Sequence, residues 1–157
     1  MTGQAAQGPG ASALAEVLRA VADALGLDAR VEVLEGPEGS LIGRVDGEDV
    51  SALVGRDGET IDALQFLCAQ IVSRAEGERR RVVIDAGDYR ARRAERLERL
   101  AVRAAQEALE HGEEIELDAM APHDRRIIHL ALKDYPGIVT RSEGEEPHRR
   151  VIVEPAE

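Results

Sequence analysis

The sequence predicts an α+β protein that consists of two small units. Apolar residues recur at helix or strand spacing in the order α-β-β-α-α-β through the first half of the chain. The second half predicts a long helix, a short strand, another helix and a final pair of strands. A chain of 157 residues is long enough for one medium domain or for two small domains with separate cores. We expect a disordered tail over residues 1–11, one domain over 12–86 and a second over 87–157.

The first unit opens with an amphipathic helix over residues 12–25, and Gly26 is suited to end it. Alternating apolar residues over 30–35 and 40–45 predict two strands, and the Gly-Pro-Glu-Gly sequence between them predicts a hairpin. A third strand is expected at 81–85. The apolar face of the first helix is expected to contain Leu14, Val17, Leu18, Val21 and Leu25.

Between two short helical patterns lies a glycine turn, Val54-Gly55-Arg56-Asp57-Gly58. Amides at the start of the following helix would face a phosphate with a favourable dipole, although Asp57 and Glu59 would oppose it. Two glycines at this spacing also occur by chance in an ordinary turn between helices. Leu53, Val54 and Ile61 would either support bases or pack in the core. The helix after the turn is expected to bury Ile61, Leu64, Cys68, Ile71 and Val72.

The second unit begins with a long helix over about 88–111, with Asp88 as its N-cap and Gly112 beyond its end. Its apolar face is expected to contain Leu97, Leu100, Ala101, Ala104, Ala105 and Ala108. A row of arginines lies nearly opposite, at Arg92, Arg96, Arg99 and Arg103. This row is either a solvated surface that nearby glutamates partly neutralise, or a track for phosphates.

A further helix opens at Pro122 and has Arg125, His129 and Lys133 along one polar edge. Two strands then follow, and the second contains Arg149 and Arg150. An arginine and a histidine one turn apart are ordinarily a surface pair. The residues expected to face the core are Ile127, Ile128, Leu130 and Ala131.

These motifs resemble two known families. The first unit is similar to a type II KH domain, in which a G-x-x-G loop clamps single-stranded RNA or DNA, and residues 53–65 carry most of the resemblance. Arg125 and His129 match the Arg-x-x-x-His signature of the R-three-H domain, which binds single-stranded nucleic acid. The two domains in succession resemble the bacterial Jag family, also called KhpB or EloR. The N-terminal Jag module that many members carry is not expected in this chain.

The resemblance implies a cytoplasmic protein that binds single-stranded RNA or DNA. It implies an RNA chaperone or post-transcriptional regulator, linked to cell elongation and envelope homeostasis, with a small KH-only partner or a second copy as its protein partner. The alternative is a protein-interaction adaptor that uses the KH fold for dimerisation and binds RNA weakly or not at all. The residues expected to bind nucleic acid are Gly55, Arg56, Asp57, Gly58, Arg92, Arg96, Arg99, Arg125, His129, Arg149 and Arg150.

The charge of the chain is unevenly distributed. The net charge is −11, whereas nucleic-acid-binding proteins usually have a basic face. Residues 79–103 nevertheless contain nine arginines and four acidic residues. An acidic body slows association with RNA, but a local basic stripe can still hold a strand.

Several other functions are disfavoured by composition. Cys68 is the only cysteine and lies on an apolar helix face, so we expect a buried thiol and no intrachain disulfide. The four histidines have no metal-ligand spacing and no catalytic motif occurs, so we expect no enzyme, metal or cofactor. No apolar stretch is long enough for membrane insertion. Only Phe66, Tyr89 and Tyr135 are aromatic, which disfavours an aromatic stacking platform.

Overall fold

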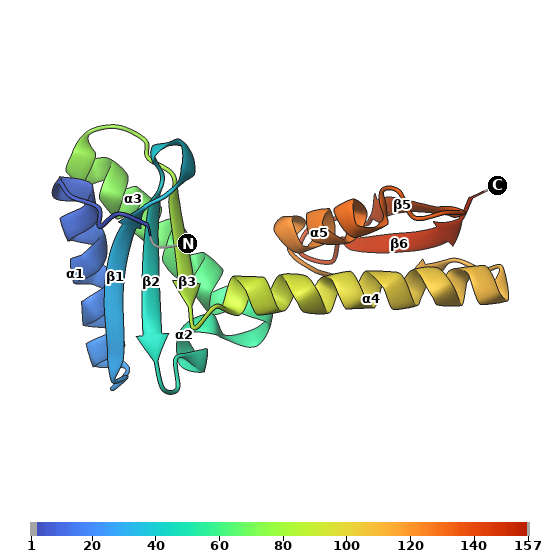
Figure 1. The fold of residues 1–157 in the computed structure, drawn as a ribbon, viewed down its shortest axis with the longest axis horizontal. Coiled ribbons are helices and arrows are strands. Elements are labelled where there is room, and N and C mark those ends of the chain that lie inside the picture. The colour runs from blue at the N-terminus through green and yellow to red at the C-terminus, as the bar shows by residue number, and fades with distance from the viewer. Residues whose placement is uncertain (1–2, 157) are drawn as a thin grey trace. The chain divides into compact units, whose positions relative to one another are not determined.

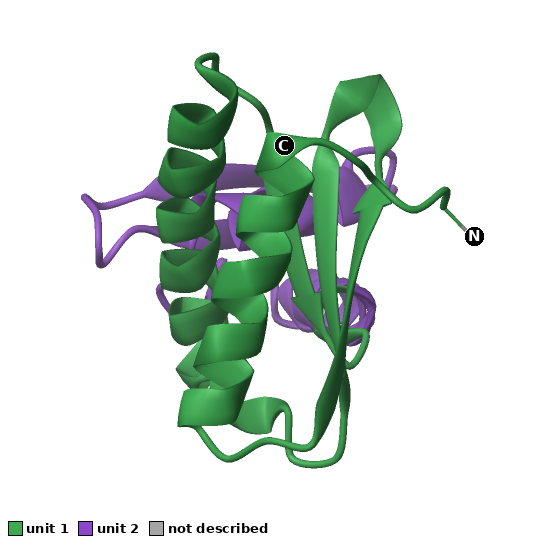
Figure 2. Cartoon of the chain, turned by 90° about the vertical axis from the view of Figure 1, so that its left-hand side faces the viewer, with its two compact units in different colours: residues 1–90 green, residues 91–157 purple. Residues whose placement is uncertain are grey.

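The computed structural model describes residues 3–156 and divides into two compact units, one up to Arg90 and one from Ala91 (Figure 2). The first unit has the α-β-β-α-α-β order predicted from the sequence. Short 3₁₀ turns, η1 (Pro37–Gly39) and η2 (Arg56–Gly58), interrupt it. Its regular elements are α1 (Pro9–Ala24), β1 (Ala29–Glu35), β2 (Leu41–Gly47), α2 (Ser51–Val54), α3 (Glu59–Glu76) and β3 (Val82–Ala86), as Figure 1 shows.

The sheet of the first unit has the order β1-β2-β3, with β1 and β2 antiparallel and β2 and β3 parallel. Helices α1 and α3 lie side by side against one face of it (Figures 1 and 2). Gly43 permits this packing, because a Cβ there would lie 2.6 Å from Cδ1 of Leu18 and 3.0 Å from Cδ1 of Ile84. The largest fully buried side chains of this core are Leu14, Leu18, Leu41, Val45, Leu53, Ile61, Val72 and Ile84.

The first helix begins three residues earlier than predicted. It starts at Pro9, and the preceding residues pair with β1, since Ala6 N donates to Val33 O at 2.9 Å. The expected disordered tail therefore differs from the structure over residues 3–11, and residues 1–2 lie outside the described residues. Gly26, with φ of 68°, ends the helix as predicted, but Leu25 is 51% exposed and does not join the core.

The second unit contains α4 (Tyr89–His111), β4 (Ile115–Glu116), α5 (Pro122–Leu132), β5 (Ile138–Glu143) and β6 (Arg150–Pro155), and the first two residues of α4 belong to the first unit. Its sheet is antiparallel with the order β4-β6-β5. Small side chains let α4 pack closely on its neighbours. The residues of this core include Leu97, Ala101, Ala104, Ala105, Ala108, Ile128, Leu132, Val151 and Val153.

The prediction that Asp88 caps the N-terminus of α4 is wrong. Asp88 has φ of 56°, and its carboxylate accepts a hydrogen bond from Nη2 of Arg44 at 3.0 Å. The amide of Arg90, in the first turn of the helix, donates instead to Oδ1 of Asp85 at 3.1 Å. At the other end Gly112 follows the last helical residue, as predicted, and donates to Ala108 O at 2.9 Å. Among the described residues, none of the helices is both long and apolar enough to cross a membrane.

Candidate nucleic-acid interface

The glycine turn forms η2 between α2 and α3, and its backbone depends on glycine at both ends. Gly55 has φ of 71° and Gly58 has φ of 89°, both in the region that side chains disfavour. A Cβ on Gly55 would overlap the side chain of Thr60, and a Cβ on Gly58 would lie 2.7 Å from Oη of Tyr89. Asp57 adopts φ of 50°, which Asp tolerates better than most residues. The turn is therefore tightly specified.

The exposed surface of the turn offers one guanidinium, one carboxylate and the positive end of α3. Arg56 and Asp57 are exposed, whereas Gly58 is buried. Backbone amides at the start of α3 would attract a phosphate through the helix dipole. The aliphatic residues beside the turn, Leu53, Val54 and Ile61, are 2, 9 and 0% exposed. They therefore belong to the core, which was one of the two alternatives for them.

The arginine row of α4 lies on the surface of the second unit, opposite the alanine-rich face that packs in the core. Its members, Arg92, Arg96, Arg99 and Arg103, are all exposed. Nη1 of Arg99 is 3.5 Å from Oε2 of Glu95, a nearby glutamate of the kind expected to neutralise the row in part. Both side chains are about two-thirds exposed, at 65 and 69%, so this pair is weak and screened by salt. The Glu95 carboxylate therefore holds Arg99 only weakly.

Arg125 is buried, which differs from its predicted place on a polar edge. Its side chain is only 9% exposed, and Nη1 donates to Met120 O at 2.7 Å. The guanidinium also donates to both carboxylate oxygens of Glu146, Nη2 to Oε1 at 2.6 Å and Nη1 to Oε2 at 3.3 Å. Hydrogen bonding by Arg125, with its positive charge, holds the pKa of the Glu146 carboxyl below its ordinary value.

His129 lies between two hydroxyl groups of β5. Nδ1 is 2.7 Å from Oγ1 of Thr140 and Nε2 is 2.8 Å from Oγ of Ser142. Burial and, second, the positive charge of Arg125 lower the pKa of His129 below its ordinary value of 6.5. The ring is therefore neutral at pH 7, with one nitrogen donating and the other accepting. Hydroxyl groups suit this state because each can take either role.

Arg150 is the first residue of β6, and Arg149 precedes the strand. Thr140 and Ser142 point toward α5, and they pair in register with Val153 and Val151. Odd-numbered residues of β6 therefore face α5, and Arg150 faces away, where it pairs with Glu116. The structure thus separates Arg150 from His129, although the sequence grouped them.

Four side chains that were not predicted from the sequence support this interface. Glu146, Thr140 and Ser142 contact the signature residues, and Asp124 joins α5 to α4 by an ion pair with Arg93 at 2.9 Å. The alternation of Thr140 and Ser142 along β5 was the available signal for a polar inward face. Leu130 is the reverse case, since it is 59% exposed where burial was expected.

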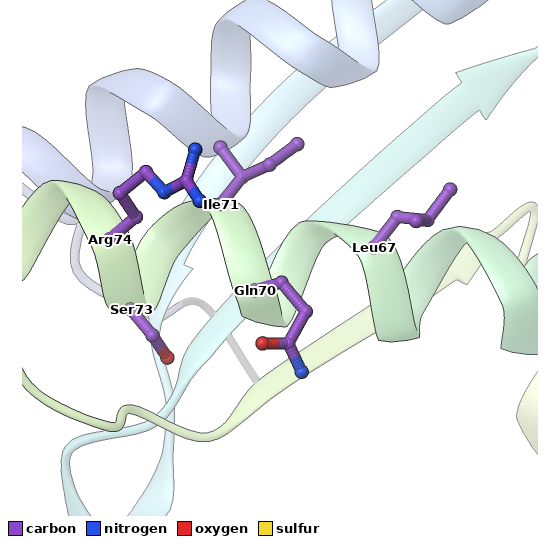
Figure 3. A pocket seen from close by; sticks show the side chains of 5 residues that line it. All are labelled: Leu67, Gln70, Ile71, Ser73 and Arg74. Atoms are coloured by element: carbon purple, nitrogen blue, oxygen red, sulfur yellow. The ribbon is translucent and has the colours of Figure 1, made fainter.

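The outward face of α3 is unexpectedly apolar. Phe66 and Leu67 are 64 and 57% exposed. Ile71, which was predicted to be buried, is 39% exposed because α3 turns it away from the sheet. A shallow hollow lies along this face, lined by Leu67, Gln70, Ile71, Ser73 and Arg74 (Figure 3). Cys68, by contrast, is buried as predicted, and burial raises the pKa of its thiol to about 11.

Two family models match the chain. The KH domain of KhpA/KhpB matches residues 11–84, and the R-three-H domain matches residues 95–155. The molecule is therefore a two-domain protein in which a KH domain precedes an R-three-H domain. Within residues 3–156, no cluster of three histidine, cysteine or acidic side chains is placed to hold a metal ion.

Curated relatives narrow the class to one family. RNA-binding protein KhpB of Clostridium symbiosum is 39% identical over 140 residues, which is 88% of this chain and 63% of that protein. The KhpB proteins of Lactiplantibacillus plantarum and Bacillus subtilis are 37 and 32% identical over 96 and 87% of this chain. The chain belongs to the KhpB family. It spans 63, 46 and 66% of the lengths of these three relatives.

Proposed function

We propose that this chain binds single-stranded RNA, through the glycine turn of its KH domain and the arginine row and signature residues of its R-three-H domain. The relatives are named RNA-binding proteins, and both domain families support the same ligand. We propose RNA and not DNA as the ligand because the relatives are named RNA-binding proteins.

The observation that carries this proposal is the exposed arginine row of α4. A chain with a net charge of −11 has four exposed arginine residues in line along one helix face. Rows of this kind neutralise successive phosphates of a strand and release their counterions. The turn at Gly55 and Gly58 adds a second, weaker contribution, because Asp57 lies beside the expected phosphate.

A titration of fluorescein-labelled 12-nucleotide RNA followed by anisotropy, at about 50 and 200 mM salt, tests this proposal. We expect the triple variant Arg92→Gln, Arg96→Gln, Arg99→Gln to bind more weakly. The slope of log affinity against log salt should fall by about two, since each phosphate contact on a single strand contributes about 0.7.

The matched control removes the same charge elsewhere. Arg19, Arg30 and Arg79 are exposed arginines of the first unit, and changing all three to Gln should leave the slope near that of wild type. Equal losses in the two triple variants would mean that net charge, and not the row, governs binding. No binding by wild type at either salt concentration would reject the proposal.

The finer roles rest on the family resemblance alone. Within this proposal the chain acts as an RNA chaperone or post-transcriptional regulator in the cytoplasm, with an effect on cell elongation and the envelope. Comparison of cell length and transcript stability with and without the triple arginine variant tests that role.

A second candidate function is supported by the apolar outward face of α3. Phe66, Leu67 and Ile71 are exposed apolar side chains of one helix, and Leu67 and Ile71 line the same hollow, as is typical of a protein-interaction surface. In this adaptor function, the KH domain pairs with a second copy or with a small KH-only protein.

Sedimentation equilibrium of the chain alone tests the pairing with a second copy. Leu67→Asp should shift a dimer toward monomer, whereas Leu130→Asp, at a similarly exposed leucine, should not. If the chain is a monomer at all concentrations, pairing with a second copy is excluded, and the KH-only protein is the partner to test.

A further inference from the structure

Glu146 lies in the turn between β5 and β6 and covers the guanidinium of Arg125. Both carboxylate oxygens accept hydrogen bonds from it, at 2.6 and 3.3 Å. The side chain of Arg125 is 9% exposed, while that of Glu146 is 52% exposed. Glu146 is therefore the solvent-facing partner of an otherwise enclosed arginine, and it is the group that an incoming ligand meets first.

The chemistry of this contact is that of phosphate recognition. A guanidinium presents a planar pair of N–H donors that fits the two oxygens of a carboxylate and the two oxygens of a phosphate equally well. Arg125 also belongs to the signature of a nucleic-acid-binding domain. A carboxylate on this arginine has the same position and charge sign as a phosphate would have.

The backbone of the turn is held independently of Glu146. Nη1 of Arg149 donates to Gly144 O at 2.7 Å and Nη2 donates to Ser142 O at 3.1 Å. The amide of His148 donates to Glu145 O at 2.8 Å. Rotation of the Glu146 side chain alone would therefore uncover the arginine, without rebuilding the turn.

We propose that Glu146 is an internal competitor for phosphate at Arg125. Its carboxylate occupies the arginine when no ligand is bound, and a phosphate of a single strand takes its place on binding. This inference rests on the proposed function. Its consequence is that the R-three-H domain binds more weakly than the arginine would allow, because each binding event must first break the ion pair. The ion pair also keeps a buried positive charge compensated when no RNA is present.

Glu146→Gln tests the competition, with Glu145→Gln as its matched control. Both variants remove one negative charge from the same exposed turn, and Gln preserves the size of each side chain. Anisotropy titrations with the labelled 12-nucleotide RNA should show about three- to tenfold tighter binding for Glu146→Gln. Glu145→Gln should bind within about twofold of wild type, because it changes only the general field.

A cycle with Arg125→Gln shows whether the gain passes through the arginine. In that background, Glu146→Gln should no longer tighten binding, and thermal melts establish that each variant is folded. If the Arg125 variant unfolds, the competition is tested on the wild-type protein by NMR. The ¹³C signal of the Glu146 carboxyl carbon should then shift when RNA is added.

The outcomes separate the two proposals. Equal effects of Glu145→Gln and Glu146→Gln, weaker binding by Glu146→Gln, or no shift of the Glu146 signal would each overturn the competition while RNA binding by wild type stands. No binding by wild type or either variant would overturn the proposed function, and the competition with it.

Discussion

Arg93 on α4 and Asp124 on α5 form a buried ion pair that links the two helices of the second unit. Nε and Nη2 of the arginine lie 3.1 and 2.9 Å from the same carboxylate oxygen, Oδ2. The other oxygen, Oδ1, lies 3.2 Å from Nε2 of His123. The Asp124 side chain is 2% exposed and that of Arg93 is 17% exposed, so neither charge is well hydrated.

Asp124→Ala should destabilise the second unit. The change removes the carboxylate that pairs with the largely buried Arg93 guanidinium, and loss of one partner of a buried pair costs about 3 kcal/mol or more. Urea unfolding followed by circular dichroism measures the loss. Asp134→Ala, at an exposed acid, is the control and should change stability by less than about 0.5 kcal/mol. Similar midpoints for both variants would contradict the structural importance of the pair.

Gly58→Ala should cost more stability than Gly77→Ala. Both glycines have positive φ, of 89 and 78°, so an added Cβ strains the backbone similarly. At Gly77 the Cβ meets no atom within 4 Å, whereas at Gly58 it lies 2.7 Å from Oη of buried Tyr89. The difference should be about 1 to 3 kcal/mol, as for overpacking elsewhere, and thermal unfolding measures it. Equal costs would mean that Tyr89 moves aside without strain.

Asp57→Lys should strengthen RNA binding and steepen its salt dependence by about one contact. The change removes a carboxylate beside the start of α3 and places an ammonium group there. Asp49→Lys is a close control, because Asp49 is also exposed, has φ of 59° against 50° for Asp57, and lies in the same unit. If both lysines improved anisotropy titrations equally, the glycine turn would have no special role.

Stability should fall as the pH is lowered from above 6.5 toward the pKa that His129 has in the folded protein. Burial and the charge of Arg125 lower that pKa, so the unfolded chain binds a proton in this window while the folded chain does not. The contribution is fully present above 6.5 and is lost on acidification. His129→Gln should flatten this part of a stability profile measured by urea unfolding. An equal flattening by His111→Gln, at an exposed histidine, would contradict the assignment.

Local patterns were sufficient for much of the fold. Apolar periodicity predicted the order of the elements, and the family resemblance predicted both domains. Gly26 and Gly112 end their helices as predicted, because a helix C-terminus depends on a few consecutive residues. The exposed arginine row followed from helical spacing in the same way. Ile71 and Leu130 were predicted to be buried but are exposed, since apolar character alone does not tell which residues a sheet covers.

The sequence by itself determined the class of the protein, the glycine turn and the residues of the Arg-x-x-x-His signature. Only the tertiary structure decided that Arg125 is enclosed, that Glu146 neutralises it, and that Arg150 faces away from His129. The physical reason is that charge pairing and strand facing depend on register and on loops distant along the chain. Arg125 and Glu146 are 21 residues apart, and no local spacing rule brings a carboxylate in a β-turn onto an arginine in a helix.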